Sequence, residues 1–266
     1  MGRKAIARKS RVGREALCEW VFRPLAHLVV LVLLPLRVPP PAVACAAGAT
    51  GLAAATAIGR GGGLAAALLV QLKTVLDNAD GQLARASGRI SVFGRYLDSE
   101  LDLLVNAALF TAIGWTTGQP LLAAAGFLAL TFVLSVNFNV ERLYRAEHGA
   151  PFDPQPEAVR LDERILRRLY LFVYAPQDRL AERFLDARLR GASPQARRLY
   201  HDRATVTVLA NLGLSTQLAV LGVCLVLGRP AAFAWLAVCQ LGLLALLAVR
   251  RELLVRHVAQ LEGGAM

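Results

Sequence analysis

In the apolar stretch between Val38 and Val140, the acidic residues gather in one short segment, residues 77–102, which reads DNADGQLARASGRISVFGRYLDSELD. A charged side chain at the centre of a bilayer costs about 2.5–3.5 kcal/mol, so aspartates on hydrophobic segments need a compensating partner. A divalent cation would compensate several of them at once. The acidic residues between Val38 and Val140 are Asp77, Asp80, Asp98, Glu100 and Asp102.

Helical periodicity places the chemically useful residues of this segment on two faces. If the preceding apolar stretch is a helix that continues past the membrane surface, positions i, i+3, i+4, i+7 and i+8 share one face. On the next helix, every fourth residue shares a face. The linker is short, so we expect the two faces to meet. If the second helix enters the membrane near residue 96, its rise of about 1.5 Å per residue places Asp102 about 9 Å below the membrane surface. The two sets are Asp77, Asp80, Gly81, Ala84 and Arg85, and then Gly94, Asp98 and Asp102.

Converging aspartates predict a magnesium or manganese site. Carboxylate oxygens are hard ligands, and Mg²⁺ or Mn²⁺ bound by them keeps coordination positions open for phosphate. Arg85 lies on the same face and offers a fixed cation to a phosphate oxygen. Gly81, Ala84 and Gly94 carry little or no side chain, so a ligand can approach both backbones. This combination indicates transfer of a phosphorus-bearing group, with metal neutralising a pyrophosphate.

The composition predicts that membrane helices position these residues. The chain has 266 residues, of which 56% are hydrophobic and 18% charged, and its mean hydropathy is +0.47. These values are typical of an all-α integral membrane protein with several spans. Short turns rich in glycine and proline join the apolar segments into hairpins. Six segments are long enough to span, at residues 41–59, 62–80, 96–115, 120–140, 204–227 and 231–249.

The spans divide the chain into residues 1–37, 38–250 and 251–266. The first part is predicted to be a basic arm with an interfacial amphipathic helix, the second the six-helix transmembrane catalytic domain, and the third a cytoplasmic tail. The interfacial helix is expected over residues 14–34, with four side chains in the headgroup region: Trp20, Phe22, Leu25 and Leu28.

A helical cytoplasmic insertion is predicted between spans four and five, over residues 141–203. Apolar residues recur there at helical spacing in two stretches, 161–169 and 180–189, which gives two amphipathic helices. These helices would lie on the membrane or cover the site as a lid. Ser193 and Pro194 are the expected N-cap and first helical residue on the approach to span five.

Basic residues predict which side of the membrane each connection faces. The three hairpin turns carry only Arg60 and Arg229 of the 30 Lys and Arg residues. The N-terminal arm, the 81–95 connection, the 141–203 insertion and the C-terminal tail hold nearly all the others. Positively charged loops stay in the cytoplasm, so both termini and the aspartates should face it. The formal net charge of +11 follows this distribution, and no nucleic-acid partner is expected.

The spacing of the motif resembles the signature of the CDP-alcohol phosphotransferases, also called CDP-alcohol phosphatidyltransferases. That signature is Asp-x2-Asp-Gly-x2-Ala-Arg-x8-Gly-x3-Asp-x3-Asp, and each of its fixed positions is present between residues 77 and 102. The resemblance implies a homodimer of six-helix protomers, each binding a pair of divalent ions, Mg²⁺ or Mn²⁺. It also implies transfer of a phospho-alcohol unit from a CDP-linked donor to an acceptor hydroxyl, with release of CMP.

The resemblance assigns roles by position. Asp102 would also be the general base on the acceptor hydroxyl, and Arg85 would touch donor phosphate. Many members begin the first span with Pro-Asn-x-x-Thr, whereas this chain has Pro-Pro-Ala-Val-Ala at residues 40–44, which puts the edge of the donor pocket in doubt. The expected metal ligands are Asp77, Asp80, Asp98 and Asp102, and the expected CDP-binding residues are Gly81, Ala84, Arg85 and Gly94.

Residues around the motif receive less specific predictions. Lys73 lies four residues before Asp77, so an ion pair or snorkelling is expected of it. Asn78 and Asn106 are expected to form interhelical hydrogen bonds. Three arginines near the cytoplasmic ends of spans four and five either bind an anionic acceptor or only mark the cytoplasmic side: Arg142, Arg145 and Arg203.

Three functions would explain aspartates within a membrane. The leading hypothesis is phospholipid synthesis by CDP-alcohol phosphotransfer from CDP-diacylglycerol, because a site at lipid depth can admit acyl chains. The acceptor could be inositol phosphate, glycerol phosphate, serine, another polar alcohol or a lipid hydroxyl. A membrane prenyltransferase is a second hypothesis, although such enzymes normally need more spans and widely separated motifs. A divalent-cation carrier would use the acids but gives no role to Gly81, Arg85 and Gly94.

Overall fold

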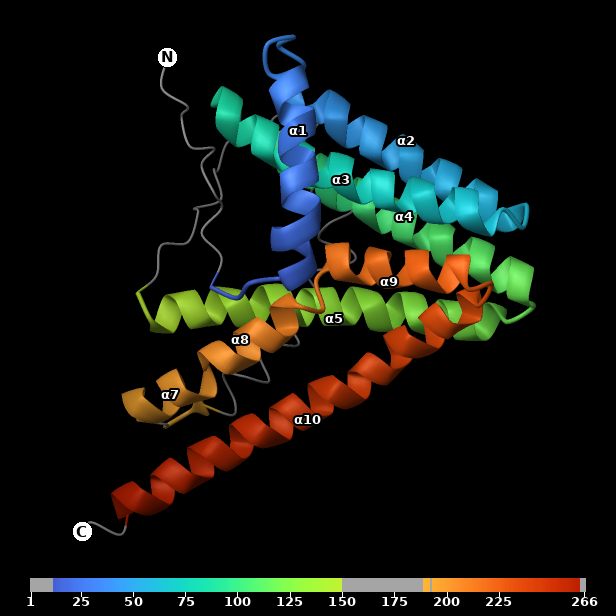
Figure 1. Cartoon of the computed structure of the whole chain (residues 1–266). Helices are drawn as coiled ribbons and strands as arrows, with labels where there is room; N and C mark the ends of the chain where they lie inside the picture. Colours follow the sequence, from blue (N-terminus) through green and yellow to red (C-terminus); the bar gives the residue numbers. More distant parts are fainter. Residues whose placement is uncertain (1–11, 150–188, 192, 264–266) are drawn as a thin grey trace.

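The computed structural model describes the backbone of residues 12–149, 189–191 and 193–263 and the side chains of these segments up to residue 256. Every regular element in these segments is helical, as predicted (Figure 1). A short π-helix, η1 (Cys18–Phe22), leads directly into α1 (Arg23–Leu33). The helices that follow are α2 (Pro40–Gly59), α3 (Gly63–Ser87), α4 (Val92–Thr117), α5 (Pro120–Glu147), α7 (Pro194–Tyr200), α8 (Arg203–Ala210), α9 (Leu214–Val226) and α10 (Pro230–Gly263).

Short turns join the long helices into hairpins at the predicted positions. Each turn contains a glycine with positive φ, a conformation that glycine adopts without steric cost: Gly61, Gly118 and Gly228. α5 and α10 then begin with proline, whose missing N–H is harmless in the first helical turn. All three turns lie at the same end of the molecule (Figure 1). The antiparallel pairs are therefore α2 with α3, α4 with α5, and α9 with α10.

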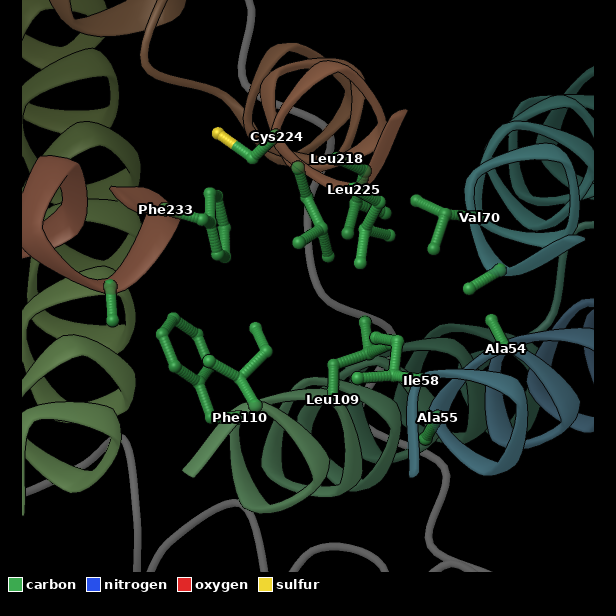
Figure 2. Close-up of a cluster of buried hydrophobic side chains, with 14 of the residues drawn as sticks. Ala54, Ala55, Ile58, Val70, Leu109, Phe110, Leu218, Cys224, Leu225 and Phe233 are labelled. Atoms are coloured by element: carbon green, nitrogen blue, oxygen red, sulfur yellow. The ribbon is translucent and has the colours of Figure 1, made fainter. Parts of the chain in front are cut away.

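The main apolar core lies between α2, α3, α4, α5, α9 and α10 (Figure 2). Within this core, the rings of Phe110 and Phe233 stack with their centroids 5.3 Å apart. α2 approaches α4 closely because it presents glycine there: a Cβ on Gly51 would lie 2.5 Å from Cγ1 of Val105. Small residues allow this kind of close backbone approach between membrane helices. The core thus holds α4, which carries part of the aspartate motif, firmly against its neighbours.

Within the described residues, four stretches are long and apolar enough to cross a membrane: Pro40–Gly59, Pro120–Glu147, Pro194–Val226 and Pro230–Arg256. They correspond to predicted spans one, four, five and six. Spans two and three correspond to α3 and α4, which are helices of 25 and 26 residues but carry the charged side chains of the motif. At about 1.5 Å per residue, both are long enough to cross about 30 Å of hydrocarbon. Their passage through the membrane, and hence the total of six spans, stays a prediction.

The fifth span is not the continuous helix predicted for residues 204–227. α8 ends at Ala210 and α9 begins at Leu214, so residues 211–213 interrupt the helix. An interruption frees backbone N–H and C=O groups, which need protein partners when they lie at membrane depth. Groups from another part of the chain bind this break, which is the physical reason for the difference.

The segment before η1 supplies those groups. Glu15 is 3% exposed, and its Oε1 accepts hydrogen bonds from the backbone N of Thr216 at 2.8 Å and from the Thr216 hydroxyl at 2.9 Å. Asn211 accepts a hydrogen bond from the backbone N of Ala16 at 2.9 Å and donates to the carbonyl of Arg14 at 3.0 Å. The N-terminal segment is thus hydrogen-bonded both to the break itself and to the first turn of α9.

The N-terminal helical stretch covers residues 16–33, which overlaps the interfacial helix predicted over residues 14–34. α1 packs on α3 and runs across the direction of the long helices (Figure 1). Trp20 and Leu28 are exposed, whereas Phe22 is buried. The headgroup position predicted for Phe22 is therefore wrong, because this ring packs inside the protein. An interfacial position for the helix itself stays a prediction.

The two amphipathic helices predicted within residues 141–203 lie outside the described residues, so the lid hypothesis is not tested. The start of α7 is described. The Ser193 hydroxyl accepts a hydrogen bond from the backbone N of Ala196 at 3.2 Å, and Pro194 is the first residue of the helix. The N-cap and the helix start predicted here are confirmed.

Candidate metal site

The aspartate motif is carried by the hairpin of α3 and α4. α3 ends at Ser87, and the next residue, Gly88, adopts a left-handed conformation with a φ of 69°. After a short linker, Ser91 caps α4 by accepting a hydrogen bond from the backbone N of Gly94 at 3.0 Å. A tight helix end followed at once by a helix start turns the chain back on itself. The motif residues of α3 are thereby placed beside those of α4, as the periodicity predicts.

Three of the four motif aspartates meet in space. One carboxylate oxygen each from Asp77, Asp98 and Asp102 lies within 4.8 Å of the other two. Asp80 is buried one helical turn beyond Asp77, but it is not part of this group of three. Carboxylate oxygens that converge from two helices are the donor set that Mg²⁺ and Mn²⁺ prefer. The chemistry of these residues therefore fits a divalent ion, and a ligand role for Asp80 stays a prediction.

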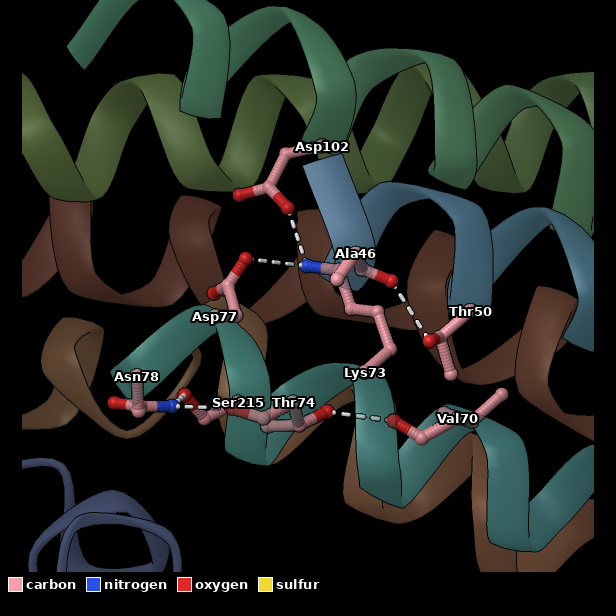
Figure 3. Close-up of polar contacts among 9 residues, drawn as sticks. All are labelled: Ala46, Thr50, Val70, Lys73, Thr74, Asp77, Asn78, Asp102 and Ser215. Carbon is pink, nitrogen blue, oxygen red and sulfur yellow. Dashed lines mark hydrogen bonds and ion pairs between the residues drawn. The ribbon is translucent and has the colours of Figure 1, made fainter. Parts of the chain in front are cut away.

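From the preceding turn of α3, Lys73 reaches two of these carboxylates, those of Asp77 and Asp102 (Figure 3). It is only 2% exposed, and its Nζ donates a hydrogen bond to Oδ1 of Asp77 at 2.8 Å. The same Nζ contacts Oδ1 of Asp102 on α4. The predicted ion pair with Asp77 is confirmed, whereas snorkelling to the membrane surface is not what this side chain does. The bridge to Asp102 was not predicted from the sequence.

The sequence does contain one signal for this role. The chain has three lysines, and Lys73 is the only one after residue 9. Every other residue of the Lys and Arg type after residue 9 is an arginine. It also falls within an apolar segment, where an ammonium group needs an acidic partner. Helical spacing identifies Asp77 as one partner. It cannot identify Asp102, because that contact depends on how α3 and α4 are aligned.

A second polar contact connects the metal-site helix with the interrupted span. The side-chain amide of Asn78 donates to the hydroxyl of Ser215 on α9 at 3.3 Å (Figure 3). Its Oδ1 accepts from Sγ of Cys18 in η1 at 3.1 Å. The interhelical hydrogen bonds expected of Asn78 are confirmed. Asn106 differs, because its Oδ1 is buried without a hydrogen-bond partner in the described part of the chain.

The proposed donor-binding residues lie further along the same hairpin. A Cβ on Gly81 would lie 3.5 Å from Nη1 of Arg85, so the Arg85 side chain lies back over this glycine. A Cβ on Gly94 would meet the cap hydroxyl of Ser91 at 3.1 Å. Gly81 therefore leaves room beside a guanidinium group, which suits an approaching phosphate. Contacts of Gly81, Ala84, Arg85 and Gly94 with a CDP moiety stay predictions, as does the pocket that would hold it.

The three arginines considered for the acceptor are in different environments. Arg145 is buried, and its Nη2 donates to Oε1 of Glu141 at 2.7 Å. Arg142 donates from Nη2 to Oδ1 of Asn139 at 3.1 Å. Arg203 is exposed at the first position of α8. Two of the three side chains thus contribute to the packing of α5, and the role of all three in acceptor binding stays a prediction.

Comparison with known proteins supports the assignment of the motif. Residues 26–155 match the family model described as CDP-alcohol phosphatidyltransferase. Three curated relatives are named "Bifunctional IPC transferase and DIPP synthase". The relative from Thermococcus kodakarensis is 32% identical over 114 residues, which are 41% of this chain and 26% of the relative. The relative from Rubrobacter xylanophilus is 37% identical over 99 residues, 37% of this chain and 22% of the relative.

The third relative, from Archaeoglobus fulgidus, is 36% identical over 84 residues, which are 32% of this chain and 16% of the relative. The matches thus cover about a quarter or less of the length of each relative. The family match includes the whole aspartate motif and the helices α2, α3 and α4 that position it. Residues 26–155 of this chain therefore belong to the CDP-alcohol phosphatidyltransferase family.

Proposed function

We propose that this protein transfers a phospho-alcohol unit from a CDP-linked donor to an acceptor hydroxyl, releases CMP, and depends on a divalent metal. The observation that carries this proposal is the convergence of carboxylate oxygens from α3 and α4 within 4.8 Å. The converging residues belong to the motif by which the chain resembles its family, and the family match covers them. Neither prenyl transfer nor cation transport receives support from that match.

Asp77, Asp98 and Asp102 are the side chains best placed to hold a divalent ion, with Asp80 as the ligand expected to complete a second site. When bound, Mg²⁺ or Mn²⁺ would neutralise the pyrophosphate of the donor and the charge that develops on the departing CMP. Ligands come from both helices of the hairpin, so a change in the α3–α4 alignment would disturb metal binding and donor binding together.

Asp102 would act as the general base. Its carboxylate would take the proton of the acceptor hydroxyl while that oxygen forms a bond to the donor phosphorus next to the alcohol. The bond from this phosphorus to the CMP phosphate oxygen breaks, and its electron pair leaves with CMP. Arg85 would hold a donor phosphate oxygen, and the small residues Gly81, Ala84 and Gly94 would leave space for the cytidine.

CDP-diacylglycerol is the donor that this architecture favours, and phospholipid synthesis is the process. The motif lies on two helices packed among others that are apolar enough to cross a membrane. A lipid donor could place its acyl chains between such helices while its head group reaches the aspartates. The relatives are named as transferase and synthase enzymes, which agrees with group transfer. The acceptor would be a polar alcohol or a lipid hydroxyl.

The wider arrangement that we propose is a homodimer of six-span protomers, with both termini and the active site facing the cytoplasm. Support comes from the three hairpin turns, which lie together at one end of the molecule and carry few basic residues (Figure 1). The linker between α3 and α4 lies at the other end, together with the C-terminal end of α5 and the start of α8, two helix ends whose sequences contain arginines (Figure 1). Positive charge on that side agrees with cytoplasmic loops.

The proposal is tested by incubating the purified protein in lipid nanodiscs with CDP-diacylglycerol, Mn²⁺ or Mg²⁺, and a panel of alcohols. CMP and the lipid products are identified by mass spectrometry. We expect CMP release that requires metal and at least one acceptor, and that is lost in Asp98→Asn. The proposal is wrong if folded protein releases no CMP from CDP-diacylglycerol or from any soluble CDP-alcohol.

A further inference from the structure

Lys73 is the most deeply buried charged side chain among the Lys, Arg, Asp and Glu residues that the structure describes. An ammonium group buried to this extent is strongly unfavourable unless carboxylates surround it. Lys73 has two such partners, Asp77 on its own helix and Asp102 on α4, and it contacts Oδ1 of each (Figure 3). Its position is thus defined by the aspartate cluster and not by the apolar core.

The two carboxylates that Lys73 contacts belong to the cluster with the geometry of a metal site. Asp77 and Asp102 form that cluster together with Asp98, with ligand oxygens within 4.8 Å of one another. A divalent cation bound by this cluster would therefore lie a few ångström from the Lys73 ammonium. Like charges at that separation repel, and burial strengthens the repulsion because less water screens it. The ammonium group and the metal ion consequently compete for the same negative charge.

We propose that Lys73 is a built-in counter-cation that sets the affinity of the aspartate cluster for divalent metal. This inference depends on the metal site proposed above, and it adds a residue that the motif does not include. Lys73 is a positioning residue: it holds Asp77 and Asp102 together across the α3–α4 interface and keeps metal binding weaker than three unopposed carboxylates would make it. Three carboxylates against one ammonium still leave an excess of negative charge, so the cluster retains its attraction for a cation.

Competition predicts the opposite of a merely structural role. A lysine that only supports the fold would, when replaced, loosen the cluster and weaken metal binding. A competing lysine would, when replaced by an uncharged side chain of similar length, strengthen metal binding and destabilise the metal-free protein. Lys73→Met is the suitable substitution, because methionine retains an unbranched apolar stem and removes the charge.

The experiment measures Mn²⁺ binding by the loss of the free-ion signal in electron paramagnetic resonance, with protein in nanodiscs. We expect Lys73→Met to bind Mn²⁺ at least about tenfold more tightly than the wild type, as for loss of one unit charge close to the ion. The melting temperature of Lys73→Met in chelator should be lower than that of the wild type. Addition of Mn²⁺ should raise the melting temperature of the variant by more than it raises that of the wild type. The matched control is Arg251→Met, which removes another buried cation, one whose contacts are with Tyr200 and His201. It should leave Mn²⁺ affinity unchanged.

The outcomes separate this inference from the proposed function. If the wild type binds Mn²⁺ and Asp98→Asn does not, the metal site stands; unchanged or weaker binding by Lys73→Met would then overturn the role of Lys73 alone. If the wild type binds no Mn²⁺ above the empty nanodisc, the metal site and the role of Lys73 both fail. If Lys73→Met folds only with Mn²⁺, that dependence supports competition. If Mn²⁺ raises the melting temperature of Lys73→Met by no more than it raises that of the wild type, competition is contradicted.

Discussion

Two buried cations in the described residues have opposite surroundings. Lys73 lies between the carboxylates of Asp77 and Asp102. Arg251 on α10 is 7% exposed and binds neutral groups: its Nε donates to the carbonyl of Tyr200 at 2.6 Å, and its guanidinium carbon lies 3.9 Å from the centre of the Tyr200 ring. One cation is thus matched with acids and the other with a carbonyl and an aromatic ring.

The difference separates a site from a structural contact. Carbonyls, aromatic rings and imidazole nitrogens satisfy the Arg251 guanidinium without adding net negative charge, so this contact joins α10 to the end of α7 and attracts nothing further. The carboxylates around Lys73 outnumber it, and they converge from two helices. Excess negative charge that the fold holds in place is what a divalent cation needs. Burial of a cation alone would not have distinguished the two regions.

The largest effect is expected for Asp102→Asn, which removes one of the two carboxylates that contact Lys73. The amide keeps the shape of the carboxylate but cannot take the proton from the hydroxyl of the acceptor substrate. CMP release should therefore fall by about 10²- to 10⁴-fold. Some Mn²⁺ binding should remain, because Asp77 and Asp98 are unchanged. Turnover and Mn²⁺ binding are measured on the same nanodisc preparation. Normal turnover in this variant would show that Asp102 is not the base.

A smaller effect, on stability and not on chemistry, is expected for Arg251→Met. The buried carbonyl of Tyr200 and Nδ1 of His201, 3.2 Å from the guanidinium, would lose their partner, which should reduce the free energy of unfolding by about 1–3 kcal/mol. CMP release per folded molecule should not change. Melting temperature and turnover are compared with Arg256→Met, an exposed position on the same helix. Loss of turnover at unchanged stability would mean that this region takes part in the reaction.

Glu15→Ala tests a buried acid whose contacts stabilise the interrupted span and not a metal site. The substitution removes the acceptor for the backbone N of Thr216, so we expect a loss of about 1 kcal/mol, comparable to the loss of an N-cap side chain. The measurement is the melting temperature of the protein in nanodiscs. Glu19→Ala serves as the control, because Glu19 pairs with Arg23 within one helix and such pairs contribute about 0.5 kcal/mol or less. Equal effects of the two substitutions would show that Glu15 does not stabilise the break.

The smallest effect on stability is expected for Gly81→Ala. The added Cβ would meet Nη1 of Arg85 at 3.5 Å, an ordinary contact, and alanine favours a helix more than glycine does, so the substitution should not lower stability. The KM for the CDP-linked donor should rise, because the methyl group occupies the space proposed for the donor. Gly126→Ala is the opposite control, since its Cβ would lie 2.7 Å from the Phe110 ring and should lower stability alone. An unchanged KM in Gly81→Ala would remove Gly81 from the donor site.

Helix positions follow closely from the sequence where proline and glycine mark the ends. Span one is predicted over residues 41–59 and α2 is Pro40–Gly59; the start of α5 at Pro120 is predicted without error. Such residues act locally, because proline cannot continue a helix from the preceding turn and glycine permits a left-handed helix end. The convergence of Asp77 with Asp98 and Asp102 follows as well, since one short turn and a period of four residues determine it.

Contacts between distant segments could not be predicted in this way. The break at residues 211–213 falls in an apolar stretch, where Asn211 and Gly213 are weak signals taken singly. Its partner Glu15 lies 201 residues before Thr216, beyond the reach of any periodicity argument. The bridge from Lys73 to Asp102 depends likewise on the alignment of two helices. Each missed feature is therefore a tertiary contact between polar groups.

The most direct test of the central claim is Mn²⁺ binding to three proteins: the wild type, Asp77→Asn on α3 and Asp98→Asn on α4. If both helices hold the ion together, each substitution should weaken Mn²⁺ binding strongly while the melting temperature in chelator shows a folded protein. Wild-type affinity in either variant would mean that the ion is bound by one helix alone, and the joint site of α3 and α4 would be contradicted.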